Sequence, residues 1–247
     1  MVDDISKRLG DVQLRIVQAA NRAGRDPDEI TLITVTKTWS AKVVIAAYRA
    51  GARHFGENRP EELARKRPEV EEVLGKDSGI VWHLIGPCQS RKTTLAADFA
   101  DRFHALDRLK IARRLSSRLV ETGNALPLFL EVNVSGESSK AGIDARRWED
   151  SEEQQNEIME IVESIQQLPG LQPVGLMSMA PWVADEGTIR DVFHRTAKLA
   201  SWIQNTVPTG NWTALSMGMT DDFELAIEEG ATHVRIGRAI LGPRQKV

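Results

Sequence analysis

Residues 31–37 read Thr-Leu-Ile-Thr-Val-Thr-Lys, a run of β-branched and apolar residues that ends in a lysine. Such a run is typical of a buried β-strand. The next residues, Thr38-Trp39-Ser40, predict a turn into a helix with Ser40 at its N-cap. A lysine at this point has two interpretations, a side chain that extends to solvent or a reactive amine at the mouth of a barrel. The strand alone does not decide between them.

Strand-like and helix-like segments alternate along the rest of the chain. Strands are predicted at 31–37, 53–58, 80–86, 103–106, 128–134, 173–178, 213–217 and 233–237. Helices are predicted at 3–24, 40–50, 60–74, 91–99, 108–122, 151–168, 187–206 and 220–229. A break or kink is expected near Pro68 because proline removes a helix hydrogen bond.

Eight repeats of strand and helix predict an α/β fold with a parallel sheet. In 247 residues they fit a closed (β/α)8 TIM barrel with an extra N-terminal helix, and we expect a single domain over residues 1–247. A doubly wound open sheet is the structural alternative. It is less favoured because the turn after the first strand lacks Gly-x-Gly-x-x-Gly.

Composition limits the partners of this protein. The net charge of −3 gives no general attraction for nucleic acid or anionic lipid. Cys88 is the only cysteine, so intrachain disulfides and multi-cysteine metal sites are excluded. The N-terminus has no signal-peptide pattern, and no apolar run approaches the roughly 20 residues of a membrane span. We therefore expect a cytoplasmic protein with no nucleic-acid or membrane partner. We also expect it to be a monomer.

The functional site of such a barrel lies at the carboxyl ends of the strands, where the last two loops commonly bind phosphate. Ser216, Gly218 and Gly237 supply a hydroxyl and backbone that a phosphate can approach closely. The alternative is that they are ordinary turn residues. A phosphate site together with the amine of Lys37 predicts a ligand that carries a phosphate and an aldehyde, for which pyridoxal 5′-phosphate (PLP) is the main candidate.

Arg235 precedes Gly237 by two residues and so shares its face of the last strand. A guanidinium that points at a pyridine nitrogen cannot give up its proton, so the ring stays unprotonated and is a weaker electron sink. The alternative is a solvent-facing charge at a strand end.

Four histidines lie on or beside strands without a metal-ligand spacing. We interpret them as packed barrel residues, although one of them, His83, can also face the site. The four are His54, His83, His104 and His233.

Several short motifs, in order along nearly the whole chain, resemble those of the pyridoxal phosphate homeostasis proteins, the barrel-only relatives of the alanine racemase N-terminal domain. The matching stretches are 35–38, Phe55-Gly56-Glu57-Asn58, 82–92, 132–135, 139–142, Gly175-Leu176-Met177-Ser178, Leu215-Ser216-Met217-Gly218-Met219 and Val234-Arg235-Ile236-Gly237. Each motif is short, and their collective spacing carries the resemblance.

The resemblance implies a barrel that holds PLP as a Schiff base on Lys37. It implies phosphate contacts from Ser216, Gly218 and Gly237. It also implies that Arg235 lies beside the ring nitrogen and that Asn58 lies near the ring. Arg59-Pro60, Cys88 and Arg91 depart from the family pattern at positions that could alter the mouth of the site.

The same resemblance argues against robust turnover. Alanine racemase uses a lysine and a tyrosine from a second domain as its two bases, and the present chain ends ten residues after its last strand. Its one tyrosine, Tyr48, lies in the helix after the first strand. We therefore expect a protein of intracellular PLP (vitamin B6) homeostasis, with weak side activity left open. A PLP-dependent amino-acid racemase and a cofactor-free Schiff-base aldolase remain the alternatives.

Two further expectations concern the transfer of PLP. The protein could deliver PLP transiently to PLP-dependent apoenzymes. Lys140, in a Ser/Gly-rich loop after the fifth strand, is either a second amine that collects PLP during transfer or a solvated loop lysine.

Overall fold

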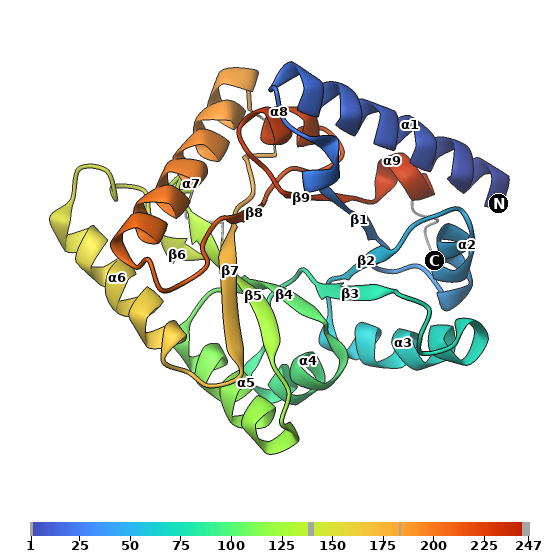
Figure 1. Cartoon of the computed structure of the whole chain (residues 1–247), viewed down its shortest axis with the longest axis horizontal. Helices are drawn as coiled ribbons and strands as arrows, with labels where there is room; N and C mark the ends of the chain where they lie inside the picture. The colour runs from blue at the N-terminus through green and yellow to red at the C-terminus, as the bar shows by residue number, and fades with distance from the viewer. Residues whose placement is uncertain (1, 138–140, 183, 244–247) are drawn as a thin grey trace.

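The fold is a closed barrel of eight parallel strands surrounded by helices, seen in a computed structural model that describes residues 2–137, 141–182 and 184–243 (Figure 1). The barrel strands are β1 (Thr31–Val35), β2 (His54–Glu57), β3 (Val81–Leu84), β4 (Arg102–Leu106), β5 (Leu126–Asn133), β7 (Leu171–Met177), β8 (Ala214–Ser216) and β9 (His233–Ile236). Pairing of β1 with β9 closes the ring, which confirms the predicted TIM barrel and excludes the open sheet.

The helices pack on the outer face of the strands. They are α1 (Val2–Arg22), α2 (Ala41–Arg49), α3 (Pro60–Leu74), α4 (Thr93–Phe99), α5 (Leu109–Thr122), α6 (Glu152–Gln166), α7 (Glu186–Thr206), α8 (Phe223–Glu228) and α9 (Arg238–Leu241). The extra N-terminal helix is confirmed. Its buried stripe of Ile5, Leu9, Val12 and Ile16 packs α1 along α8 and α9 (Figure 1).

Small elements depart from the predicted pattern. A two-residue strand, β6 (Ile143–Asp144), pairs with the end of β5, and single 3-10 turns lie at η1 (Pro27–Glu29) and η2 (Ser90–Lys92). α3 continues through Pro68 without the expected break. Leu63 and Val70 are fully buried on either side of this proline, so packing holds the helix across it.

The barrel interior is unusually polar at mid-height. Interiors of this fold are normally filled by bulky apolar side chains. Here the rings of His83, His104 and His233 gather around Phe129, with neighbouring ring centroids between 4.2 and 6.4 Å apart. This layer lies below the residues that line the pocket described next.

Candidate functional site

A cavity of about 480 Å³ opens at the carboxyl ends of the strands, within the roughly 300–1,000 Å³ typical of small-molecule sites. Four of the six predicted site residues line it: Lys37, Asn58, Arg235 and Gly237. Its walls also include Val35, Trp39, Ile85, Met179, Trp182, Ile189 and Met219. The amine of Lys37 and the guanidinium of Arg235 therefore line one cavity, and the roles assigned to them from the sequence stay predictions.

Lys37 sits in a tight turn that the backbone does not adopt easily. The N–H of Trp39 donates to the carbonyl of Thr36 at 3.0 Å, which makes Lys37 and Thr38 the central residues of a β-turn. Thr38 has φ of 70°, the only non-glycine residue with positive φ in the described part of the chain. Glycine or asparagine normally occupies such a position, and a β-branched residue there is strained.

A buried ion pair lies behind this turn. Lys66 of α3 and Glu57 of β2 are both fully buried, and the Lys66 Nζ donates to Glu57 Oε1 at 2.6 Å. The same ammonium donates to the Thr36 carbonyl at 2.9 Å and to Glu62 Oε1 at 3.0 Å. Glu62 in turn accepts the Thr38 N–H at 2.7 Å. These contacts hold the backbone on both sides of Lys37.

The charges in this cluster offset one another. Burial raises the pKa of Glu57 to about 7, whereas Lys66 and the Thr36 hydroxyl, which both donate to Glu57 Oε1, lower it in part. We call Glu57, Glu62 and Lys66 the ion-pair cluster. Sequence reasoning missed its role, because a Glu-Lys pair four residues apart on a highly charged helix usually marks a surface.

Arg235 is 5% exposed, so a solvent-facing charge is the wrong interpretation. Its Nη1 donates to the Ser216 carbonyl at 2.6 Å and to Ser216 Oγ at 2.7 Å, and its Nη2 donates to the Ser178 carbonyl at 3.0 Å. Burial lowers the pKa of Arg235 to about 10, with Asp222 and Glu131 raising it in part. A pKa near 10 still leaves the guanidinium protonated at neutral pH.

Ser216 and Gly218 lie beside the cavity rather than on its wall. The Ser216 side chain is fully buried, and its hydroxyl is already engaged by Arg235 and by His104 Nδ1 at 2.8 Å. Gly218 has φ of +91°, and an added Cβ would come within 2.6 Å of the Ala226 Cβ. Gly237, at the start of α9, does line the cavity. Phosphate binding by these residues stays a prediction.

The residues that depart from the family pattern do not form the described mouth of the cavity. The described lining does not include Arg59, Pro60, Cys88 or Arg91. Burial raises the pKa of the Cys88 thiol to about 11. Instead, an ion pair between Arg238 and Asp221 and the 81% exposed side chain of Trp182 lie at the opening.

Tyr48 is placed away from the cavity. Its hydroxyl donates to the carbonyl of Ser78 at 3.0 Å, in the loop that leads into β3. That loop is at the amino end of the strands, whereas the cavity is at their carboxyl ends. Tyr48 is therefore not positioned to act as a base on a ligand held by Lys37.

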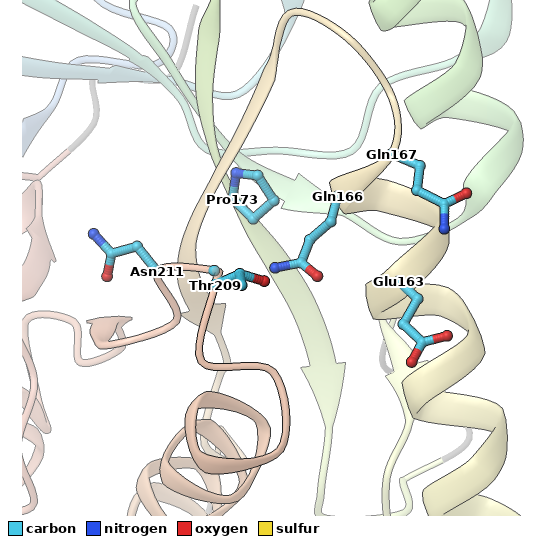
Figure 2. Close-up of a pocket in the computed structure, with 7 residues that line it drawn as sticks. Glu163, Gln166, Gln167, Pro173, Thr209 and Asn211 are labelled. Atoms are coloured by element: carbon cyan, nitrogen blue, oxygen red, sulfur yellow. The ribbon is translucent and has the colours of Figure 1, made fainter.

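A second cavity, of about 450 Å³, lies between α6 and the loop before β8 (Figure 2). Its lining consists of Glu163, Gln166, Gln167, Pro173, Thr209, Gly210 and Asn211. Its described lining contains neither a lysine nor an arginine, the groups that recognise a phosphate or attack an aldehyde. We therefore take the cavity at Lys37 as the functional site.

The described part of the chain contains neither a metal-binding cluster nor a membrane-spanning helix. No cluster of three or more histidine, cysteine, aspartate or glutamate side chains arranged to hold a metal occurs among the residues that the structure describes. Within the same residues, none of the helices combines the length and the apolar character needed to cross a membrane.

Comparison with known proteins identifies the family. The alanine racemase N-terminal domain family matches residues 13–245. A pyridoxal phosphate homeostasis protein from Pseudomonas aeruginosa is 39% identical over 240 residues, which cover 97% of this chain and 96% of the relative. The chain belongs to the pyridoxal phosphate homeostasis protein family. An Escherichia coli member of this family is 37% identical and covers 98% of both chains.

The family includes a member solved with its ligand. PipY of Synechococcus elongatus has been solved with PLP bound, and this chain superposes on it with a TM-score of 0.80 at 30% identity, covering 96% of this chain and all of PipY. The curated relatives in the family are named for homeostasis of PLP and not for a catalysed reaction.

Proposed function

We propose that this protein binds PLP in the cavity at Lys37 and takes part in intracellular PLP homeostasis without robust turnover. The observation that carries the proposal is that a turn-held lysine and a buried, protonated arginine line one cavity. Membership of a family whose relatives are named for PLP homeostasis supports it, as does the PLP-bound PipY structure.

The residues of the cavity fit the chemical groups of PLP. Lys37 supplies the amine for a Schiff base with the aldehyde, and Arg235 supplies a donor for the ring nitrogen. Asn58, which also lines the cavity, would lie near the ring. The phosphate would lie at Gly218 and Gly237, where the first N–H groups of α9 have no partner within the helix. Ser216 stays a predicted phosphate contact, although its hydroxyl is engaged by Arg235 and His104. When bound, PLP supplies an electrophilic aldehyde and a ring that accepts electrons.

The absence of robust turnover follows from what the cavity offers as a second base. Asp221 and Asp222 are the carboxylates of the described lining. Asp221 is paired with Arg238, and Asp222 accepts the Met219 N–H. A racemase needs a base that is free to exchange a proton on the face opposite Lys37. A racemase-type enzyme is the alternative, and an activity screen against amino acids distinguishes it.

The mode of use is a further part of the proposal. We infer that the whole chain acts as one barrel unit, as a cytoplasmic monomer that releases PLP to PLP-dependent apoenzymes. Lys140 falls outside the described residues, so its role as a transient second amine is carried by its sequence position alone.

Absorption spectroscopy tests the proposal directly. The purified protein with PLP should show a visible band that is lost in Lys37→Ala and retained in Lys42→Ala, a matched exposed lysine on the neighbouring helix α2. Borohydride reduction and peptide mapping should place the adduct on Lys37. A protein without the band contradicts PLP binding and leaves the cofactor-free aldolase. A band that is intact in Lys37→Ala contradicts attachment of PLP to Lys37.

The same mapping under excess PLP decides the role of Lys140. An adduct at Lys140 in addition to Lys37 supports transient capture of PLP by Lys140. Modification of Lys37 alone contradicts it.

A further inference from the structure

A chain of hydrogen bonds runs through the barrel interior and ends at Arg235. His54 Nδ1 lies 3.0 Å from His83 Nε2, and His83 Nδ1 lies 2.8 Å from His104 Nε2. His104 Nδ1 lies 2.8 Å from Ser216 Oγ, which accepts from Arg235 Nη1 at 2.7 Å. We call these four residues before Arg235 the histidine chain. His54, its outer end, is half-buried, whereas the other three are fully buried.

The rings of the histidine chain are neutral at physiological pH. Burial lowers the pKa of His54 and holds the pKa values of His83 and His104 well below 6.5. A neutral imidazole has one N–H donor and one acceptor nitrogen. Each ring must therefore donate on one side and accept on the other, so all the bonds in the chain run in the same direction.

Arg235 sets that direction. A guanidinium can only donate, so Ser216 Oγ is its acceptor. Within the described residues, the hydroxyl hydrogen of Ser216 then has one acceptor in reach, His104 Nδ1. It follows that His104 carries its proton on Nε2 and donates to His83 Nδ1. His83 likewise carries its proton on Nε2 and donates to His54 Nδ1.

We propose that His104, backed by His83, is a positioning residue that acts through Ser216 to hold the Arg235 guanidinium at the proposed PLP ring. Because His104 Nδ1 accepts the hydrogen bond from the Ser216 hydroxyl, the lone pairs of that oxygen are directed toward Arg235. This inference rests on the proposed function for its ligand and goes beyond it in assigning a role to residues below the cavity.

A purely structural role explains the arrangement less well. Burying an imidazole is unfavourable unless its nitrogens are hydrogen-bonded, and an apolar side chain fills a barrel at lower cost. His233 offers the comparison, because it belongs to the same layer and packs on Phe129 with ring centroids 5.0 Å apart. Its Nδ1 bonds to Thr232 Oγ1 at 2.8 Å, outside the chain to Arg235.

The first experiment measures the direction of the chain without any ligand. Side-chain ¹⁵N and ¹³C chemical shifts of the wild-type protein distinguish the two neutral imidazole tautomers. We expect His104 and His83 to be protonated on Nε2. Protonation of either ring on Nδ1 reverses the chain and overturns the proposal, whatever the protein binds.

The second experiment compares matched variants by titration with PLP. His104→Leu removes the acceptor for Ser216 and should weaken PLP binding by up to about tenfold, the upper end of one neutral hydrogen bond, and shift the visible band. His104→Asn keeps an acceptor near the Nδ1 position and should restore both. His233→Leu, a change in the same layer, should lower the unfolding midpoint and leave the affinity and the band unchanged.

The outcomes separate this inference from the proposed function. If wild type binds no PLP, the proposed function fails and the tautomers still decide the direction of the chain. If wild type binds PLP and His104→Leu retains its affinity and band, or loses them only as far as His233→Leu does, the positioning role is wrong. If His104→Leu does not fold, His104→Asn and the wild-type tautomers remain as tests.

Discussion

Two buried polar groups of residues support the cavity, and they differ in charge. The ion-pair cluster of Glu57, Glu62 and Lys66 is built from ionisable groups and holds the backbone of the Lys37 turn. The histidine chain is neutral and holds a side chain, that of Arg235. The two share no residue.

The difference follows from what each has to fix. A strained turn needs strong acceptors and donors at defined backbone atoms, and charged groups make the stronger hydrogen bonds. Arg235 is itself a buried charge, so a second ionised group beside it would move its pKa and its preference for a ring nitrogen. A chain of neutral dipoles positions it without adding charge.

The largest effect is expected from breaking the ion-pair cluster. Lys66→Met leaves the buried Glu57 carboxylate without its cation, which typically costs about 3–5 kcal/mol of unfolding free energy. Urea unfolding measures the loss. Arg65→Met, at the exposed neighbouring position on α3, is the control and should change stability by about 0.5 kcal/mol or less.

Adding Glu57→Gln to Lys66→Met removes the unpaired charge and should recover part of the stability. Equal losses for Lys66→Met and Arg65→Met, or no recovery in the double variant, would show that Glu57 and Lys66 do not act as a buried ion pair.

The buried histidines, those of the histidine chain together with His233, are expected to respond to acid. Burial lowers the pKa of His233 to about 3 and holds those of His83 and His104 well below 6.5, so the unfolded chain binds more protons than the folded one below pH 6.5. The stability that these buried, neutral histidines contribute is fully present above pH 6.5. It is lost as the pH falls toward the folded pKa values, by about 1.4 kcal/mol per pH unit for each histidine.

Urea unfolding at a series of pH values tests this assignment. His104→Asn should reduce the slope of unfolding free energy against pH, between pH 6 and 5, by the contribution of one histidine, about 1.4 kcal/mol per pH unit. Phe129→Leu, which alters the ring stacked on His104 without changing a titratable group, should lower stability at every pH with the slope of wild type. An unchanged slope in His104→Asn means that His104 is already able to take up a proton in the folded state.

The fold and the main residues of the cavity could be predicted from sequence because both follow from the order of strands and helices along the chain. Eight strand signals in turn fix a barrel, and the residue at each strand end must then face one mouth. That logic placed Lys37, Asn58, Arg235 and Gly237 on one cavity. This prediction did not require knowing in which direction the side chains below the strand ends point.

The two buried groups could not be predicted because they depend on which face of an element is buried. Both faces of a barrel strand are covered, so the sequence of β4 does not tell whether His104 points inward or toward the helices. Lys66 lies on a helix rich in charge, and only the packing of that helix on β2 and β3 buries it. The contacts of the Ser216 hydroxyl with Arg235 and His104 could not be predicted for the same reason, since the direction of this side chain follows from strand register.

The smallest expected effect concerns the strain that the ion-pair cluster maintains. Thr38→Gly removes the penalty of positive φ at this position and should raise the unfolding free energy by about 1 kcal/mol, because the relieved strain exceeds the added freedom of the unfolded chain. Thr94→Gly, at an exposed helical position of α4, should lower it by a similar amount. The same substitution, threonine to glycine, is therefore expected to raise the unfolding free energy at position 38 and to lower it at position 94.

The same variant links strain to function. A glycine at 38 can leave the turn conformation that Glu62 now holds, so the Lys37 amine should be less fixed and PLP binding weaker by a few-fold. Calorimetry and PLP titration on one preparation measure both quantities. A variant that gains stability with unchanged affinity would mean that Lys37 is positioned by the cavity wall alone, and that the ion-pair cluster serves folding rather than the site.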